Sequence, residues 1–191
     1  MLSNYNRQNS FVGQVNNILC FLRKLTSVVK CKLFKAYCYS FYGCELWSLE
    51  HSKLNDFVIA WRKGVRRIWG LPYNTHSDLL PILSNCLPIF DEICRRFLVF
   101  SYNCIHHDSE IIRSVASYSL LFARNDSVLG KNAIFCSQRY GRTLDELFLE
   151  NVHLSTHVIN NYCDEQTLED RMSTALFLHE CVLLRDGVLS F

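Results

Sequence analysis

Four basic side chains in one short stretch are the residues best suited to chemistry. They are Arg62, Lys63, Arg66 and Arg67, and the pairs 62/66 and 63/67 would each lie one turn apart on a helix. Like charges at that spacing destabilise an isolated helix, so an anionic partner is a natural reason to keep them. Guanidinium groups bind phosphate oxygens with parallel hydrogen bonds. The cluster therefore predicts contact with a nucleic-acid backbone, and the alternative is a solvated helix face.

The element that positions this cluster is an amphipathic helix predicted over residues 53–69. Its opposite face is apolar at steps of three and four residues, and Gly70, followed by Pro72, predicts its end. Trp61 and Trp69 are candidates either for stacking on bases or for packing, and Trp61 fits the core better. The apolar face consists of Leu54, Phe57, Val58, Trp61, Val65 and Ile68.

The charge distribution extends the basic character upstream of this helix. Residues 1–70 hold 11 Lys and Arg against 3 Asp and Glu, whereas residues 71–191 hold 9 against 15, although the whole chain is only at +2. This asymmetry favours a polyanion at the basic end, and a chance gradient over a solvated surface is the alternative. The further candidate nucleic-acid-binding residues are Lys30, Lys32 and Lys35, with Arg23 and Lys24 beside them.

The ten cysteines and seven histidines do not have the spacing of a zinc site. Structural zinc sites use close pairs such as C-x₂-C, and the sequence contains no such pair. The polar N-terminus has no secretory signal, so the cysteines are predicted to be reduced, buried thiols. The nearest approximation to a metal site combines Cys104, His106 and His107 with His153, His157 and Cys163.

Catalytic motifs are also missing from the sequence. We find no nucleophile elbow, P-loop, dinucleotide-binding glycine motif or H-E-x-x-H. Adjacent carboxylates occur at predicted helix starts or on polar faces, where the helix dipole explains an acidic first turn. We therefore predict no catalytic residue and no cofactor in this chain. The doublets are Asp91-Glu92, Asp145-Glu146, Asp164-Glu165 and Glu169-Asp170.

The fold class predicted from the hydrophobic spacing is all-α, an irregular multi-helix bundle. Hydrophobic residues make up 49% of the chain, with seven Gly and three Pro, which is typical of a globular protein. No strand-like alternation persists. No run of eighteen apolar residues occurs, so we expect no membrane span. Helices are predicted over residues 14–25, 28–47, 53–69, 77–83 (short), 88–105, 108–123 and 165–185.

The predicted organisation has five parts. Residues 1–13 are expected to form a polar N-terminal tail, 14–72 a basic helical segment and 73–123 a helical continuation. Residues 124–142 are expected to be an irregular connection, and 143–191 C-terminal helices that begin at a Thr143–Glu146 capping box. On the helix over 108–123, the residues expected to face inward are Ile111, Ile112, Val115 and Tyr118, with Leu121 or Phe122.

Three segments resemble one known family. They are residues 11–25 (FVGQVNNILCFLRKL), 32–47 (KLFKAYCYSFYGCELW) and 60–100. They are similar to the C-terminal part of reverse transcriptases from non-LTR, LINE-like retrotransposons. The pattern Tyr42-Gly43-x-Glu45-x-Trp47 and the turn Arg66-Arg67-x-x-Gly70-Leu71-Pro72 carry most of the resemblance, which covers roughly residues 11–142.

The resemblance implies a non-catalytic fragment of an RNA-directed DNA polymerase. In that family the chemistry lies in a palm with a Tyr/Phe-x-Asp-Asp motif that binds Mg²⁺, and this sequence has no such motif. The matching segments would form the thumb-like helical region after the palm, which grips the template–primer duplex. We therefore expect RNA or DNA and the missing palm as partners, no membrane, and a cytoplasmic or nuclear location. A start at an internal methionine of a truncated element copy is also expected.

Other hypotheses besides the polymerase fragment remain at this point. A helical protein–protein interaction module, or a relic that does not bind nucleic acid, would expose apolar surface that normally packs on the palm. That surface is expected along Leu33, Phe34, Phe41 and Trp47. An independent enzyme is the third possibility, and no motif supports it.

Overall fold

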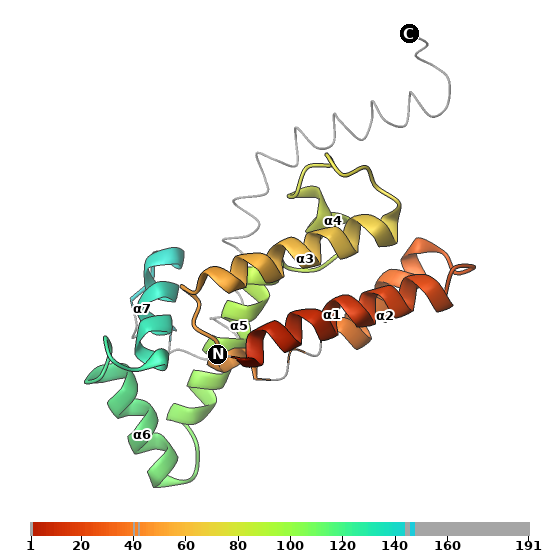
Figure 1. The fold of residues 1–191 in the computed structure, drawn as a ribbon. Coiled ribbons are helices and arrows are strands. Elements are labelled where there is room, and N and C mark those ends of the chain that lie inside the picture. Colours follow the sequence, from red (N-terminus) through yellow and green to blue (C-terminus); the bar gives the residue numbers. More distant parts are fainter. Residues whose placement is uncertain (1, 40, 42, 144–145, 148–191) are drawn as a thin grey trace.

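The computed structural model describes residues 2–39, 41, 43–143 and 146–147, and all regular secondary structure in them is helical (Figure 1). This confirms the predicted all-α fold class. The predicted helix over residues 165–185 lies outside the described residues. The elements are α1 (Leu2–Phe21), α2 (Ser27–Cys38), the 3₁₀-helix η1 (Cys44–Leu46), α3 (Ser52–Trp69), α4 (Leu79–Ser84), α5 (Ile89–Ile105), α6 (Glu110–Leu121) and α7 (Val128–Tyr140).

The core is one continuous cluster of buried side chains that extends from α1, α2 and α3 through α5 to α6 and α7 (Figure 1). The part between α1, α2 and α3 contains a cluster of aromatic rings. The ring of Phe57 on α3 lies 5.1 Å from that of Phe11 on α1 and 5.0 Å from that of Phe41. Phe34 on α2 is fully buried and meets Tyr39 edge to face at 5.5 Å. Edge-to-face and tilted pairs of this kind add to the stabilisation from apolar burial.

The prediction of a polar tail over residues 1–13 is wrong, because α1 begins at Leu2. Phe11, Val15 and Ile18 form a buried stripe at steps of four and three residues. Once this packed part of α1 has formed, adding residues at its end costs much less than nucleating a new helix. The polar composition of the first ten residues therefore did not prevent helix formation.

The prediction of one helix over residues 28–47 is also wrong, because α2 ends at Cys38. Gly43 has φ +76°, a left-handed conformation that glycine adopts without steric cost and that cannot continue an α-helix. The chain turns here, so that Phe41 and Cys44 are buried. Gly43 thus permits the turn that leads into η1.

The third correction concerns residues 124–142, predicted as an irregular connection, where the structure has α7. The Ser127 hydroxyl caps this helix by accepting a 2.9 Å hydrogen bond from the backbone N–H of Gly130. Leu129, Ala133, Cys136 and Tyr140 form its inner face, but Gly130 and Asn132 lower its helix propensity. This diluted pattern is the reason that the sequence did not reveal the helix.

Other boundaries agree with the prediction. Helix α3 covers the predicted 53–69 and is followed by Gly70 at φ +66°, and α5 begins directly after Pro88. The capping box is confirmed as well. The backbone N–H of Thr143 donates to the Glu146 carboxylate at 3.0 Å, and that of Glu146 donates to the Thr143 hydroxyl at 3.3 Å.

Two predictions about burial are wrong in opposite directions. Of the expected exposed surface, Phe34 and Phe41 are buried, and Leu33 and Trp47 are partly buried against the core. The residues expected to face inward on α6 are instead exposed, because α6 packs through Ala116 and Leu120. The exposed residues are Ile111, Ile112, Val115, Tyr118 and Leu121 on α6 and Phe122 directly after it.

Candidate nucleic-acid interface

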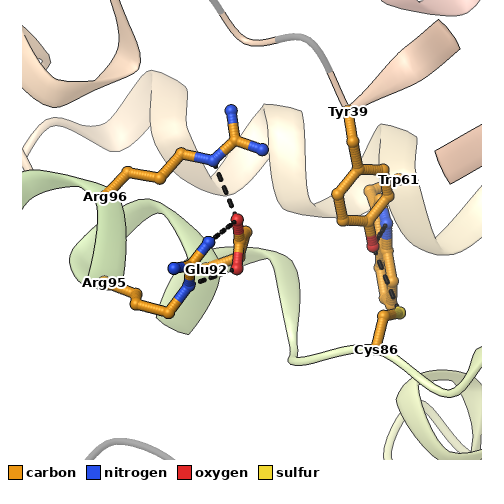
Figure 2. Close-up of polar contacts among 6 residues, drawn as sticks. All are labelled: Tyr39, Trp61, Cys86, Glu92, Arg95 and Arg96. Carbon is orange, nitrogen blue, oxygen red and sulfur yellow. Dashed lines mark hydrogen bonds and ion pairs between the residues drawn. The ribbon is translucent and has the colours of Figure 1, made fainter. Parts of the chain in front are cut away.

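The rotation of α3 about its axis is fixed by Trp61. This side chain is 2% exposed, and its indole N–H donates a 2.7 Å hydrogen bond to the Tyr39 hydroxyl. That hydroxyl in turn donates to the Cys86 sulfur at 3.2 Å (Figure 2). Burial raises the pKa of Tyr39, so its hydroxyl stays protonated. Trp61 therefore belongs to the core, as the sequence favoured, and the basic residues of α3 lie on the other side of the helix.

Two of the four predicted cations, Lys63 and Arg67, lie along one groove. Both are exposed and line a groove of about 570 Å³ between α1 and α3. The Arg67 guanidinium donates a 2.7 Å hydrogen bond to the side-chain oxygen of Asn16 on α1. The groove also has an apolar lining, which includes Val12, Val15 and Ile59, and one carboxylate, Asp56, at the N-terminal part of α3. It therefore combines cationic donors with apolar surface, and the sequence did not reveal that α1 forms its other wall.

Arg66 has a different environment from Lys63 and Arg67. Its guanidinium donates to the carbonyl oxygen of Thr75 at 2.8 Å and to the Ser77 hydroxyl at 3.3 Å, and it lies 6.0 Å from the centre of the Tyr73 ring. Arg66 thus ties the segment after α3 to the helix. Arg62, one turn before it, is partly exposed. The predicted cluster therefore separates into a groove pair, Lys63 and Arg67, an arginine with a structural role, Arg66, and the partly exposed Arg62, which does not line the groove.

None of these four cations makes an ion pair with a residue that the structure describes. The four ion pairs recorded there involve His76–Asp78, Arg95–Glu92, Arg96–Glu92 and Arg139–Asp91. The positive charge of the groove pair is therefore not neutralised by a carboxylate contact within the described fold. A phosphate could take that place without displacing a carboxylate from either cation.

The lysines predicted on the helix over 28–47 fall on α2, where two of them contact the backbone. The Lys30 ammonium donates to the carbonyl oxygen of Arg23 at 3.2 Å, and that of Lys35 donates to the carbonyl oxygen of Asn85. Lys32 is exposed. No recorded contact among the described residues joins these lysines to the groove pair.

The acidic doublet Asp91-Glu92 lies at the start of α5, where the sequence predicted only an interaction with the helix dipole. In the structure both carboxylates are buried, and each forms its own cluster of hydrogen bonds. The Glu92 carboxylate accepts hydrogen bonds from Arg95 at 2.7 and 2.9 Å and from Arg96 at 2.8 Å (Figure 2). Burial acts to raise the pKa of Glu92, but the hydrogen bonds from both arginines outweigh it and lower the pKa. Glu92 is therefore ionised and paired, and the i+3 and i+4 spacing of its partners was a signal that the sequence contained.

Asp91 forms the second cluster with α7. It accepts hydrogen bonds from the Arg139 guanidinium at 3.0 Å and from the Tyr140 hydroxyl at 2.9 Å. The partners lie 48 and 49 residues away, so no local pattern could have revealed them. Asp91 thus holds α5 to α7, whereas Glu92 pairs with arginines of α5 itself, and both carboxylates have a structural role.

The described cysteines are free thiols. Five of the eight are buried: Cys31, Cys38, Cys44, Cys94 and Cys136. Within the described ranges no group of three or more His, Cys, Asp or Glu side chains is arranged to hold a metal ion. His153, His157 and Cys163 lie outside those ranges. The helices described here also include none that is both long and apolar enough to span a membrane.

The expected resemblance to LINE-like reverse transcriptases depends on two short motifs, and the structure places their glycines at a turn and at a helix end. Gly43 forms the turn into η1, and Gly70 follows the last residue of α3. Arg66, the first residue of the second motif, holds the segment around Thr75. No protein-family model, curated protein or solved structure matches this chain.

Proposed function

We propose that this chain is a non-catalytic, nucleic-acid-contacting helical region of a LINE-like reverse transcriptase, from the part that follows the palm. The observation that carries the proposal is the groove between α1 and α3. Lys63 and Arg67 line it, and neither has a carboxylate partner among the described residues. A cationic groove of this kind suits the backbone of RNA or DNA.

The groove holds one of its two cations in place. The Asn16 side chain, which accepts a hydrogen bond from Arg67 at 2.7 Å, restricts the rotamers of that long side chain. A pre-oriented guanidinium loses less conformational entropy when it binds a phosphate. Lys63 lies one turn before Arg67 and supplies a second, mobile positive charge. In this proposal the two side chains contact the phosphate backbone without reading its sequence.

The proposal assigns the chemistry of polymerisation to the palm of the parent enzyme. Mg²⁺ would bind there, and no residue of this chain is assigned to it. The partners proposed for this chain are the template–primer nucleic acid and the palm itself. The net charge of residues 1–70, which hold 11 basic against 3 acidic side chains, would attract a polyanion over a longer range than direct contact.

A matched pair of double variants tests this proposal in the full chain. Lys63→Gln with Arg67→Gln removes two charges from the groove, and Lys131→Gln with Arg142→Gln removes two exposed charges elsewhere. The affinity for a labelled RNA–DNA duplex is measured by fluorescence anisotropy. We expect the groove variant to lose about tenfold or more in affinity and the control to lose much less. Equal losses in both would show that only net charge matters and would overturn the groove assignment.

A further inference from the structure

The groove between α1 and α3 has charges of opposite sign toward its two ends. The two helices pack against each other (Figure 1). Lys63 and Arg67 line the groove toward the C-terminus of α3, and Asp56 lines it toward the N-terminus. Asp56 and Lys63 are seven residues apart, which is close to two helical turns and about 10 Å along the axis. A contact with phosphates alone does not require a carboxylate at this place.

The part of the groove between these charges is apolar. Val12 on α1 is 39% exposed and Ile59 on α3 is 46% exposed, and both line the groove. Ala60 and Gly64, which also line it, have a small side chain or none and leave the space open on the side of α3. The volume of about 570 Å³ lies in the range of sites for small organic groups, roughly 300–1,000 Å³.

A nucleotide has chemical groups in the same order as the groove. Its phosphate is anionic, the faces of its base are flat and apolar, and the outer edge of some bases carries an amino group. Apolar side chains hold bases that have left the helical stack, and a carboxylate accepts a hydrogen bond from the amino group of cytosine. A duplex presents only base edges in its grooves, so it cannot place the face of a base on the apolar wall. The lining therefore favours an unpaired nucleotide.

We propose that the groove binds one unpaired nucleotide of a single strand, whose base carries an exocyclic amino group. The phosphate lies against Lys63 and Arg67. The base lies with one face against Val12 and Ile59, and its amino group donates a hydrogen bond to the Asp56 carboxylate. The binding of this nucleotide rests on the proposed function, because it uses the same groove and the same cations. It adds a single-stranded substrate and a preference among bases.

Four labelled RNA–DNA duplexes test the proposal with the full chain. One is blunt, and three carry a single-stranded RNA overhang of equal length made of cytidines, uridines or abasic nucleotides. The abasic overhang has the same phosphates without bases, and uridine has a carbonyl oxygen where cytidine has its amino group. Affinities are measured by fluorescence anisotropy at one salt concentration. We expect the cytidine overhang to bind about fivefold or more tighter than the abasic one and about threefold or more tighter than the uridine one.

Two pairs of variants assign these preferences to the groove. Ile59→Ser removes apolar surface at an exposed position without changing the charge, and Ile111→Ser on α6 is its control. Ile59→Ser should reduce the advantage of cytidine over the abasic overhang to about twofold or less. Asp56→Asn removes the carboxylate of the groove, and Glu50→Gln removes an exposed carboxylate outside it. Both raise the affinity for any polyanion, but only Asp56→Asn should abolish the preference for cytidine over uridine, because an amide can also donate to the uridine carbonyl.

The outcomes separate the nucleotide proposal from the proposed function. Equal affinity for the cytidine and abasic overhangs, or a cytidine advantage that Ile59→Ser leaves unchanged, would overturn the nucleotide proposal. So would equal affinity for cytidine and uridine, or a preference for cytidine that persists in Asp56→Asn. In each of these cases, binding of the blunt duplex that depends on Lys63 and Arg67 would leave the proposed function standing. A chain that binds none of the four nucleic acids would overturn both.

Discussion

The indole N–H of Trp61 on α3 donates a 2.7 Å hydrogen bond to the hydroxyl of Tyr39, which follows α2 directly in the sequence. Both residues are buried, so this bond acts together with the buried apolar face of α3 to hold that face on the core. The side of α3 that carries Lys63 and Arg67 is consequently directed toward the groove with α1. One buried hydrogen bond thus links the packing of the core to the position of the candidate interface.

Replacing Tyr39 with Phe should destabilise the fold by about 1–3 kcal/mol. The change removes the acceptor of the Trp61 N–H and leaves that donor buried without a partner. Urea unfolding followed by circular dichroism gives the change in the free energy of unfolding. Tyr73→Phe, at an exposed position, is the control and should have little effect. If the two variants are equally stable, the Trp61–Tyr39 bond does not contribute as described.

The stability contributed by Glu92 should depend on pH. Its pKa is lowered in the fold, so its contribution is complete above the unfolded pKa of about 4.3 and is lost as the pH falls through the lower folded pKa. Glu92→Gln should cost about 2 kcal/mol at neutral pH, less than the roughly 3–5 kcal/mol for breaking a fully buried pair, because Arg95 and Arg96 are partly exposed and recover hydration.

The measurement is urea unfolding of the native chain and Glu92→Gln across a pH series. The difference in unfolding free energy should be constant near neutral pH and should shrink as the pH falls below the unfolded pKa of about 4.3 and through the lower folded pKa of Glu92. Glu110→Gln, an exposed carboxylate on α6, is the control and should change little. A difference for Glu92→Gln that does not vary with pH would contradict the ion-pair role.

Gly130 should tolerate no side chain. A Cβ atom added there would lie 2.4 Å from the Cα atom and 2.5 Å from the carbonyl oxygen of Arg124, so the α6–α7 connection would have to move. We expect Gly130→Ala to lower the free energy of unfolding by about 1–3 kcal/mol. Gly13→Ala is the matched control. Nothing lies within 4 Å of its added Cβ in α1, and we expect a gain of about 0.5–1 kcal/mol from helix propensity.

Thiol reactivity should distinguish the buried cysteines from Cys20. Burial raises the pKa of Cys38 to about 11, and burial together with the nearby Glu45 raises that of Cys44 to about 11. Both are almost fully protonated at neutral pH and inaccessible, whereas Cys20 is exposed. Brief alkylation of the native chain, read by mass spectrometry, should modify Cys20 first. Modification of Cys38 or Cys44 at the rate of Cys20 would contradict the packing of α2 and η1.

The sequence was most informative where one local pattern determined both faces of an element. In α3 the apolar stripe and the basic residues alternate with the helical period, so the extent of the helix, its end at Gly70 and the burial of Trp61 were all predicted. The groove was not predictable in the same way. Its second wall comes from α1, and Asn16 lies 51 residues before Arg67, so only tertiary packing brings the two together.

The errors have a common physical origin in packing between distant elements. Helix α6 has apolar residues around most of its circumference, and its pattern favoured the large ones as the inner face. Packing on α5 and α7 instead uses Ala116 and Leu120, which allow a close approach. Helix α7 was not predicted because Asn132 lowers its helix propensity. The side chain of Asn132 makes a contact with residues that are distant in the sequence. The Asn132 side chain bonds the backbone of Trp47 and Leu49 at 2.6 and 2.9 Å.

The salt dependence of nucleic-acid binding tests the proposed interface most directly. The affinity of the native chain and of the Lys63→Gln, Arg67→Gln variant for an RNA–DNA duplex is measured over a series of salt concentrations. If the two side chains contact phosphates, the slope of log affinity against log salt should fall by up to about two units in the variant. A native chain that does not bind, or a variant with unchanged affinity and slope, would contradict the assignment of the groove as a nucleic-acid interface.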